Sequence, residues 1–413
     1  MANRYFVCTR NSPPVEFDVA EDRPVRDAEI AYFIRGFRIL ERTHEFDGFT
    51  VCFAWGSRTK IPQLGGHVVA VIYGDEHGRI PAYAGKVRAV MKCHGLYPAF
   101  TPRSRPLRLA QIEVAEFLRN LALWLPTGWR WLASRRIRNR CHLLPLGYGV
   151  PPDTPVVDFT RRRYLTSFLG SVAPPARGRI LRSFVGTPKS YSRGRLVRAL
   201  REVEDRHGPD QVRLSVTPGF QESLSNERAY AELMAETRIC VAPRGTARET
   251  WRVFEGLRAG CVVISDKLPQ HPFYENSPIL QIEDWRDLPD IIDGLLRDPA
   301  GMQELHERGL RHWRDVLSEA ALARRYAEIL CLRERGDVQE ADARPTAPAR
   351  WDLALNPASW ALSRCRNGPA PEVLSGVGLF QSGGVTRGPE RFGSGHREGR
   401  PWSTMSGSTC RWS

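Results

Sequence analysis

The sequence has few of the features that mark several common classes of protein. Its nine cysteines include no Cys-x-x-Cys pair, so neither a zinc ribbon nor a redox dithiol is indicated. No stretch approaches the roughly 18 uninterrupted apolar residues of a membrane-spanning helix. The residues from Met1 to Arg10 lack the basic and then apolar order of a signal peptide. We therefore expect a protein of the cytoplasm, free or peripheral at the inner face of the membrane.

Lysine is also scarce, because only five of the 60 basic residues are lysine and the others are arginine. The net charge of +14 invites a nucleic-acid interpretation. The arginine clusters at 135–140 and 161–163 carry neither the interleaved aromatic residues of a single-strand platform nor a zinc-finger pattern. We expect no nucleic-acid partner, whereas a small acidic ligand or an anionic membrane surface suits the charge.

The 413 residues are enough for two or three domains, and we predict the first over residues 1–144. Short apolar runs typical of strands alternate there with amphipathic runs typical of helices, which predicts an α/β domain. A segment rich in Gly and Pro, 145–160, is expected to link it to the next domain. The predicted strands lie at 5–8, 49–54, 68–73 and 87–91, and the predicted helices at 27–42 and 107–125.

The second region, 161–335, has a sharper alternation of apolar strands and helices, which indicates a parallel, doubly wound, Rossmann-like domain. The last region, 336–413, is poor in Leu, Ile, Val and Phe and rich in Gly, Pro and Ser, so we expect a disordered tail. In the second region the strands are expected at 166–170, 212–216, 239–242, 261–265 and 279–282, and the helices from a Ser192 cap to 208 and at 226–237, 247–259, 288–296 and 302–317.

The most informative stretch runs from Val241 to Asp266 and is predicted to form a strand, a loop, a helix and a second strand. Ligands of doubly wound sheets bind outside the carboxyl ends of strands, against the helix that follows. Gly245 permits close approach of a backbone, and the Arg244 guanidinium suits a phosphate. Two plainer interpretations stay open: Thr246 and Glu249 match a capping box, and the polar face with Arg252 and Glu255 suits solvated ion pairs.

The same stretch resembles the C-terminal signature of the exostosin-like glycosyltransferases. The resemblance covers roughly residues 140–330, including Tyr164 to Ser171 upstream, and fades before residue 140. Thr250 and Trp251 depart from the usual pattern at their positions. The residues that carry it are Pro243-Arg244-Gly245, Glu249, Arg252, Glu255, Ala259-Gly260-Cys261 and Asp266.

The resemblance implies a B-type glycosyltransferase fold, in which two Rossmann-like domains face a cleft. The first domain would bind the acceptor and the second a nucleotide-sugar donor. Arg244 would meet the diphosphate, Glu255 the ribose, and Glu249 and Arg252 the donor or its loop. The other positions that it implies for the donor are Gly170, Ser171, Arg179 (or Arg182), Gly245, Thr246 and Asp266.

The expected function is transfer of a sugar from a nucleotide-sugar to a glycan or polysaccharide-precursor acceptor. Because the sequence has no Asp-x-Asp pair, we expect neither a metal nor a cofactor, and arginine and helix-dipole stabilisation of the leaving group. Arg244 and Glu249 are the catalytic candidates, with Asp75 or His94 as a base unless both are ordinary loop residues. Retention and inversion stay open. The alternative is a non-catalytic nucleotide-binding or scaffold protein.

One further segment suggests a membrane contact. The run from Leu121 to Trp131 holds three tryptophans and is followed by the basic cluster at 135–140, as in an interfacial helix. A core helix that ends in a basic loop is the alternative.

Overall fold

The computed structural model describes residues 2–20, 30–98, 100, 107–149, 155–172, 187–217 and 227–335, and every structural statement below concerns these residues. They all belong to one compact unit, Met1–Pro348. The predicted tail, 336–413, and the candidates Arg179 and Arg182 lie outside the described residues.

The first sheet has six strands in the order β2-β1-β3-β4-β5-β6, all parallel except β2. Its central strands are apolar throughout, as strands covered on both faces must be. The four predicted strands of this region are confirmed, whereas the short edge strands β2 and β6 were not predicted. The strands are β1 (Arg4–Cys8), β2 (Val15–Phe17), β3 (Thr50–Ala54), β4 (Gly65–Ile72), β5 (Val87–Lys92) and β6 (Cys141–Leu143).

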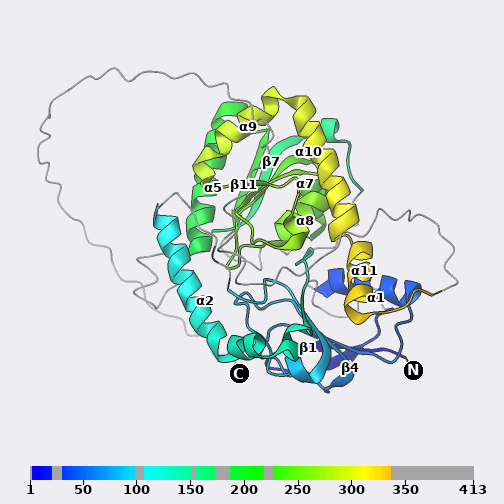
Figure 1. Cartoon of the computed structure of the whole chain (residues 1–413). Helices are drawn as coiled ribbons and strands as arrows, with labels where there is room; N and C mark the ends of the chain where they lie inside the picture. The colour runs from blue at the N-terminus through cyan, green and yellow to red at the C-terminus, as the bar shows by residue number, and fades with distance from the viewer. Residues whose placement is uncertain are drawn as a thin grey trace, which may run out of the picture. The chain divides into compact units, whose positions relative to one another are not determined.

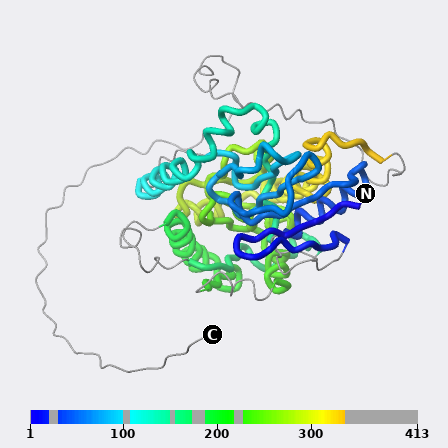
Figure 2. Tube along the Cα trace, turned by 90° about the horizontal axis from the view of Figure 1, so that it is seen from below, coloured from blue at the N-terminus to red at the C-terminus, as the bar shows by residue number. Residues whose placement is uncertain are grey.

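Helices cover both faces of this sheet (Figure 1). α1 (Ala31–Thr43) lies on one face together with α11 (Glu319–Leu330), and the rings of Phe37 and Tyr326 stack with centroids 4.1 Å apart. The blue and orange segments of Figure 2 lie side by side accordingly. The other face packs against Trp124 and Trp131 of α2 (Leu107–Ala133). A short helix, α3 (Arg135–Arg138), follows α2, and a 3-10 turn (Ala84–Lys86) comes just before β5.

The second sheet has five parallel strands in the order β11-β10-β9-β7-β8. One face carries α5 and α9, and the other carries α7 and α8. The elements are β7 (Tyr164–Ser171), α5 (Pro188–His207), β8 (Val212–Thr217), α7 (Glu227–Ala235), β9 (Thr237–Ala242), α8 (Trp251–Arg258), β10 (Val262–Asp266), β11 (Leu280–Ile282), α9 (Leu288–Arg297), α10 (Pro299–His312) and a π-helical turn (Trp313–Leu317), with 3-10 turns at Phe159–Arg161, Pro272–Tyr274 and Trp285–Asp287.

Two predicted helix starts in this region are wrong. α5 is capped by Thr187 with Pro188 as its first residue, and Ser192 instead lies buried inside the helix. α8 begins at Trp251 with Thr250 at the N-cap position, so residues 243–250 form a loop. Thr246 and Glu249 therefore do not form a capping box, and Glu249 is free for other partners.

The expected fold class is confirmed: two parallel α/β sheets with helices on both faces, arranged as in the B-type glycosyltransferase fold. The limits predicted for the domains stay a prediction. The structure adds that the last described helix, α11, packs against α1 of the first sheet rather than against the second sheet.

Candidate functional site

A pocket of about 530 Å³ lies where the carboxyl ends of strands from both sheets converge. Such ends are the usual ligand sites of open parallel sheets, because the following loops and helix starts face them. The first-sheet side contributes Trp55, Tyr73, Gly74, Glu76, His94 and Leu146. The second-sheet side includes Leu169, Lys189, Arg193, Gly245, Glu249 and Arg252.

Three cationic side chains line the second-sheet side of this pocket. Arg193 of α5 donates to the carbonyl oxygens of Ser171 (2.8 Å) and Arg244 (3.3 Å). Arg252 of α8 donates to the carbonyl of Leu169 and stacks on the Phe168 ring. Lys189 lies one turn before Arg193 on α5. Within the described part of the chain, none of the three cations forms a salt bridge with a carboxylate. The charges of Glu76, Asp266 and Glu255 act on Lys189, Arg193 and Arg252 in turn, without close contact.

Neighbouring positive charges lower the pKa values of the two cations on α5. Burial lowers the pKa of Arg193 to about 10, and the neighbouring Arg252 adds to the effect. The pKa of Lys189 is lowered by burial and by Arg193. An anion between these side chains would relieve both the repulsion and the desolvation. The cluster therefore has the electrostatics of an anion site.

Glu249 forms the centre of a buried polar cluster that joins the two halves of the pocket. Its carboxylate accepts from the Tyr274 hydroxyl (2.8 Å), lies 3.2 Å from Nδ1 of His271, and lies 3.4 Å from Nδ1 of His94. Burial alone would raise the pKa of Glu249, but His271 and His94 outweigh it and hold the pKa well below its ordinary value. Glu249 is thus a carboxylate that orients an imidazole.

His94 has an unusual backbone. It follows β5 with a φ of 58°, in the left-handed region that a residue with a β-carbon rarely occupies. Such conformations cost free energy and gather at functional sites. The structure thus brings together two of the predicted candidates, Glu249 from the second region and His94 from the first, 3.4 Å apart at one pocket.

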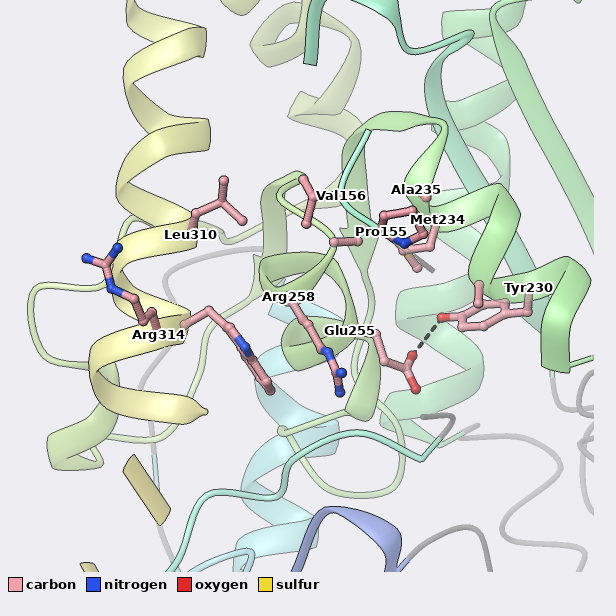
Figure 3. Close-up of a pocket in the computed structure, with 12 residues that line it drawn as sticks. Pro155, Val156, Tyr230, Met234, Ala235, Glu255, Arg258, Leu310 and Arg314 are labelled. Carbon is pink, nitrogen blue, oxygen red and sulfur yellow. Dashed lines mark hydrogen bonds between the residues drawn. The ribbon is translucent and has the colours of Figure 1, made fainter. Parts of the chain in front are cut away.

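Glu255 is also held by both halves of the chain. Its carboxylate accepts from the Tyr230 hydroxyl (2.7 Å) and from the backbone N–H of Gly149 (3.3 Å). Tyr230 and Glu255 line the main pocket and also a second pocket of about 450 Å³, into which Arg258 and Leu310 project (Figure 3). The pair separates the two pockets, and the ribose-binding role of Glu255 stays a prediction.

Arg244 has a different environment from the one expected. Its guanidinium is 1% exposed and donates to Glu113 (2.9 Å) and Glu116 (2.7 Å) of α2. Arg248 approaches the same Glu113 at 3.4 Å. The guanidinium therefore holds α2 against the 243–246 loop, and its charge is already neutralised. The diphosphate contact predicted for the Arg244 side chain does not fit this buried, paired geometry.

The remaining predicted donor residues divide into lining and supporting positions. Gly245 and Thr246 line the pocket, and Gly170 lies against Arg252, where a β-carbon would come 3.3 Å from Nη2. Asp266 supports the site from below: its Oδ2 accepts from Ser192 (2.5 Å), the Arg244 N–H (2.9 Å) and Trp285 (3.0 Å).

Asp75, which was predicted as a candidate base, lies in an environment that does not suit this role. Its side chain is fully buried and pairs with Arg79 (3.2 Å) and Lys92 (3.6 Å), and the Ser57 hydroxyl donates to it. Burial alone would raise the pKa of Asp75, but Lys92, Ser57 and Arg79 lower it to about 2. A carboxylate so strongly committed to its partners is a poor proton acceptor, so Asp75 is a structural residue.

Sequence reasoning missed Lys189, Arg193, His271 and Tyr274. Lys189, one of the five lysines, stands at the start of a helix that the sequence analysis began too late. A search for cations on the first turns of the helix after β7 would have found both Lys189 and Arg193. His271 and Tyr274 lie in a short turn after β10, for which the sequence offers no comparable signal.

Neither a metal-binding group nor a membrane-spanning helix is found among the described residues. No group of three or more His, Cys, Asp or Glu side chains is arranged to hold a metal ion among them. No described helix is both long enough and apolar enough to cross a membrane.

The second half of the chain has a recognisable family likeness. Residues 193–331 match the family model described as glycosyl transferase-like. This region is similar to glycosyltransferases. The match begins at Arg193 and includes α8 and the loop before it. It does not single out the exostosin-like enzymes, so that finer assignment stays a prediction. A comparison with functionally described proteins finds no match.

Solved structures give a distant likeness. The glycosyltransferase AviGT4 of avilamycin A biosynthesis is 14% identical with a TM-score of 0.33, over 80% of this chain and 97% of that one. The pneumococcal O-GlcNAc transferase GtfA, in complex with UDP and GlcNAc, is 10% identical with a TM-score of 0.36, over 72% and 59%. Sucrose-phosphate synthase from Thermosynechococcus elongatus is 13% identical with a TM-score of 0.32, over 68% and 88%. Scores this low add nothing to the assignment of function.

Proposed function

We propose that the protein is a glycosyltransferase, of the exostosin-like kind, that moves a sugar from a nucleotide-sugar donor to a glycan or polysaccharide-precursor acceptor without a metal. The observation that carries the proposal is the cation cluster of Lys189, Arg193 and Arg252, which forms no salt bridge within the described residues and lines the same pocket as the Glu249–His94 pair. The match of residues 193–331 to the glycosyl transferase-like family supports it.

The leaving group would be stabilised by the cation cluster. As the bond between the sugar's anomeric carbon and the diphosphate oxygen breaks, negative charge grows on the diphosphate. Lys189 and Arg193 on one helix, with Arg252 on another, are positioned before the reaction and need not rearrange around that charge. Preorganised charge in a partly dry pocket is among the largest contributions to catalysis. Gly245 leaves room for the phosphates beside the loop.

The acceptor would be activated by His94. Because Nδ1 of His94 faces the Glu249 carboxylate, Nε2 is the nitrogen left to take a proton. The acceptor hydroxyl passes its proton to Nε2, its oxygen forms the new bond to the anomeric carbon, and the diphosphate leaves with the electron pair of the broken bond. Glu249 would stabilise the imidazolium that forms, and Tyr274 and His271 would hold Glu249 in place.

Binding of nucleoside diphosphates tests the first part of the proposal. Titration of UDP, GDP, dTDP and ADP by calorimetry, with and without EDTA, should reveal at least one that binds with the same affinity under both conditions. If none of the four binds to the folded protein, the donor site is not where we place it. A dependence on divalent metal would overturn the metal-free mechanism alone.

Turnover tests the second part. With the nucleotide-sugars of the base that binds, His94→Gln should lower the rate of donor consumption roughly 100-fold or more, as loss of a general base does. The affinity for the diphosphate should stay within about twofold. Binding without turnover for wild-type protein, across donors and a broad acceptor set, would instead favour the non-catalytic scaffold.

A peripheral contact with an anionic membrane belongs to the same proposal, and the outer face of α2 supports it. Trp124 and Trp131 face the core, as the core-helix alternative requires, but Trp129 is 58% exposed. At 3.6 residues per turn, the exposed apolar side chains fall within an arc of about 60°, with Arg119 and Arg130 along one flank. They are Leu107, Val114, Leu118, Leu125, Trp129 and Leu132.

Flotation with vesicles tests this contact. The protein should float with phosphatidylcholine vesicles that contain about 30% phosphatidylglycerol and not with pure phosphatidylcholine. The double variant Leu118→Glu/Trp129→Glu should lose flotation, whereas Val216→Glu, a change at an equally exposed apolar residue outside α2, should keep it. Equal flotation of the two variants would show that α2 is not the contact.

A further inference from the structure

An exposed tryptophan stands on the first-sheet side of the pocket. Trp55 directly follows β3 and lines the pocket next to Tyr73 and Gly74, which follow the adjacent strand β4. It is 45% exposed, whereas the aromatic residues in the core of this half are nearly inaccessible. Single exposed apolar side chains are common on protein surfaces, but a large ring that lines a pocket at the carboxyl edge of the sheet is available to a ligand.

The indole is fixed in place rather than loose on the surface. It meets the buried Tyr73 ring edge-on, with centroids 5.3 Å apart. The backbone of Gly74 also lies directly against Trp55: a β-carbon there would come within 2.5 Å of the Trp55 backbone carbonyl oxygen and within 2.7 and 2.8 Å of the indole atoms Cδ2 and Cε2. Only glycine allows an approach this close. One side of the indole therefore rests on the protein and leaves the other side for a ligand.

A buried charge network holds the two loops that meet at this contact. The Ser57 hydroxyl donates to the Asp75 carboxylate and lies 2.6 Å from the Arg79 carbonyl oxygen. Asp75 pairs in turn with the fully buried Lys92. Ser57 comes two residues after Trp55, and Asp75 comes directly after Gly74. The network thus holds the loop that carries Trp55 against the loop that carries Gly74. These buried charges therefore have a structural role that is separate from the chemical step.

We propose that Trp55 is a stacking platform for a pyranose ring of the acceptor glycan, with Asp75 and Gly74 as the residues that position it. This inference rests on the proposed function and names the part of the site that selects the acceptor. The aromatic face is electron-rich and apolar, and so suits the apolar C–H face of a pyranose. Glu76 lines the same side and offers a carboxylate to sugar hydroxyls.

The position of Trp55 favours a sugar over a nucleobase, which would also stack on an indole. The cations that suit a diphosphate, Lys189 and Arg193, belong to the second-sheet side, and Trp55 belongs to the first-sheet side with His94. A ligand ring on Trp55 therefore lies on the side of the pocket that also carries the group that would take the acceptor's proton. A donor base would have to cross the pocket to reach it.

The experiment measures sugar binding and nucleotide binding in the same variants. The probes are methyl α-D-glucopyranoside, methyl α-D-mannopyranoside, methyl β-D-galactopyranoside and maltotriose, followed by saturation-transfer NMR, and UDP, GDP, dTDP and ADP by calorimetry. The variants are Trp55→Ala, Trp55→Phe and Gly74→Ala, with Tyr97→Ala as a control of similar exposure (47%) outside the pocket.

We expect at least one sugar probe to bind wild-type protein, with its Kd raised fivefold or more in Trp55→Ala and in Gly74→Ala. Trp55→Phe should stay within about threefold of wild type, and Tyr97→Ala within twofold. Nucleoside diphosphate affinity should not change in any variant. The Gly74→Ala result tests whether the ring must be held in place, since that variant keeps the indole but displaces it together with the Trp55 backbone carbonyl.

Three outcomes would overturn the platform: no sugar probe binds wild-type protein, Trp55→Ala binds sugars as well as Tyr97→Ala does, or Trp55→Ala weakens the nucleoside diphosphate instead. Failure of the proposed function looks different. There, no nucleoside diphosphate binds wild-type protein, whether or not the sugars bind through Trp55.

Discussion

Two kinds of charged group lie near the pocket, and they differ in how their charge is compensated. Around Arg244 the charges are sealed: the guanidinium is 1% exposed and meets two carboxylates of α2 at 2.9 and 2.7 Å. On α5 they are open: among the described residues Arg193 donates its hydrogen bonds to backbone carbonyl oxygens, and its pKa is lowered by burial and by Arg252, against a smaller opposite effect of Asp266. Asp75 with Lys92 forms a second sealed group.

The difference teaches that the presence of a cation beside a strand end does not identify an anion site. In a sealed ion pair the attraction between the two partners offsets part of the free energy of their desolvation. The pair therefore attracts a further charged ligand only weakly. An open cation keeps that attraction and gains when an anion arrives. Sealed charges should therefore matter mainly for stability and open ones for binding, which gives the comparison measurable consequences.

The largest expected effect is on the sealed group. Arg244→Met should lower the free energy of unfolding by about 3–5 kcal/mol, because Glu113 and Glu116 would be left buried or half-buried without their main partner. Urea unfolding measures it. The change Arg193→Met, by contrast, should cost about 1 kcal/mol or less, since burial and repulsion from Arg252 offset its two hydrogen bonds.

A rescue variant makes this prediction sharper. Adding Glu113→Gln and Glu116→Gln to Arg244→Met should recover part of the lost stability, because the uncompensated carboxylates are then absent. Equal destabilisation by Arg244→Met and Arg193→Met would remove the distinction between sealed and open charges.

The next effect falls on binding. Arg193→Met should raise the Kd of the nucleoside diphosphate about 30- to 100-fold, which corresponds to about 2–3 kcal/mol. Arg198→Met is the matched control, because Arg198 lies on the same helix and is exposed away from the pocket. Calorimetry at two salt concentrations should also show weaker binding at the higher one. Loss of affinity in Arg198→Met as well would point to net charge rather than to a site.

The periodicity of the sequence was enough to predict most of the fold. All four predicted strands of the first sheet formed, because a continuous apolar run such as Val68 to Tyr73 has few alternatives in a parallel sheet. The short edge strands, such as Val15–Phe17, were missed because three half-exposed residues carry no pattern. The start of α8 was misplaced because Thr246 and Glu249 match a cap by spacing, while tertiary contacts draw Glu249 to His271 instead.

The site was less predictable for a physical reason. Whether a charge is sealed depends on partners far away in the sequence, and Glu113 lies 131 residues before Arg244. No local pattern reports that pairing. His94 was named as a candidate because it follows a buried strand and Glu249 because of the family resemblance. Only the structure joins them, and their catalytic roles stay predictions. Lys189 and Arg193 were missed because the helix that presents them was given a later start.

The smallest expected effect concerns the Asp75–Lys92 pair and how the free energy of unfolding changes at acidic pH. Because the pKa of Asp75 is lowered to about 2 from an ordinary value of 3.8, its carboxylate form stabilises the fold at every pH above 4. That contribution, at most about 2 kcal/mol by the size of the shift, should fall as the pH drops from 4 through 2.

In Asp75→Asn the same fall should be missing, so the stability gap between wild type and variant should shrink by about half between pH 5 and pH 3 in urea titrations. An open carboxylate would show no such change. A gap that stays constant over this range would mean that Asp75 is not sealed, and that Lys92 and Ser57 do not clamp the loops that carry Trp55 and Gly74.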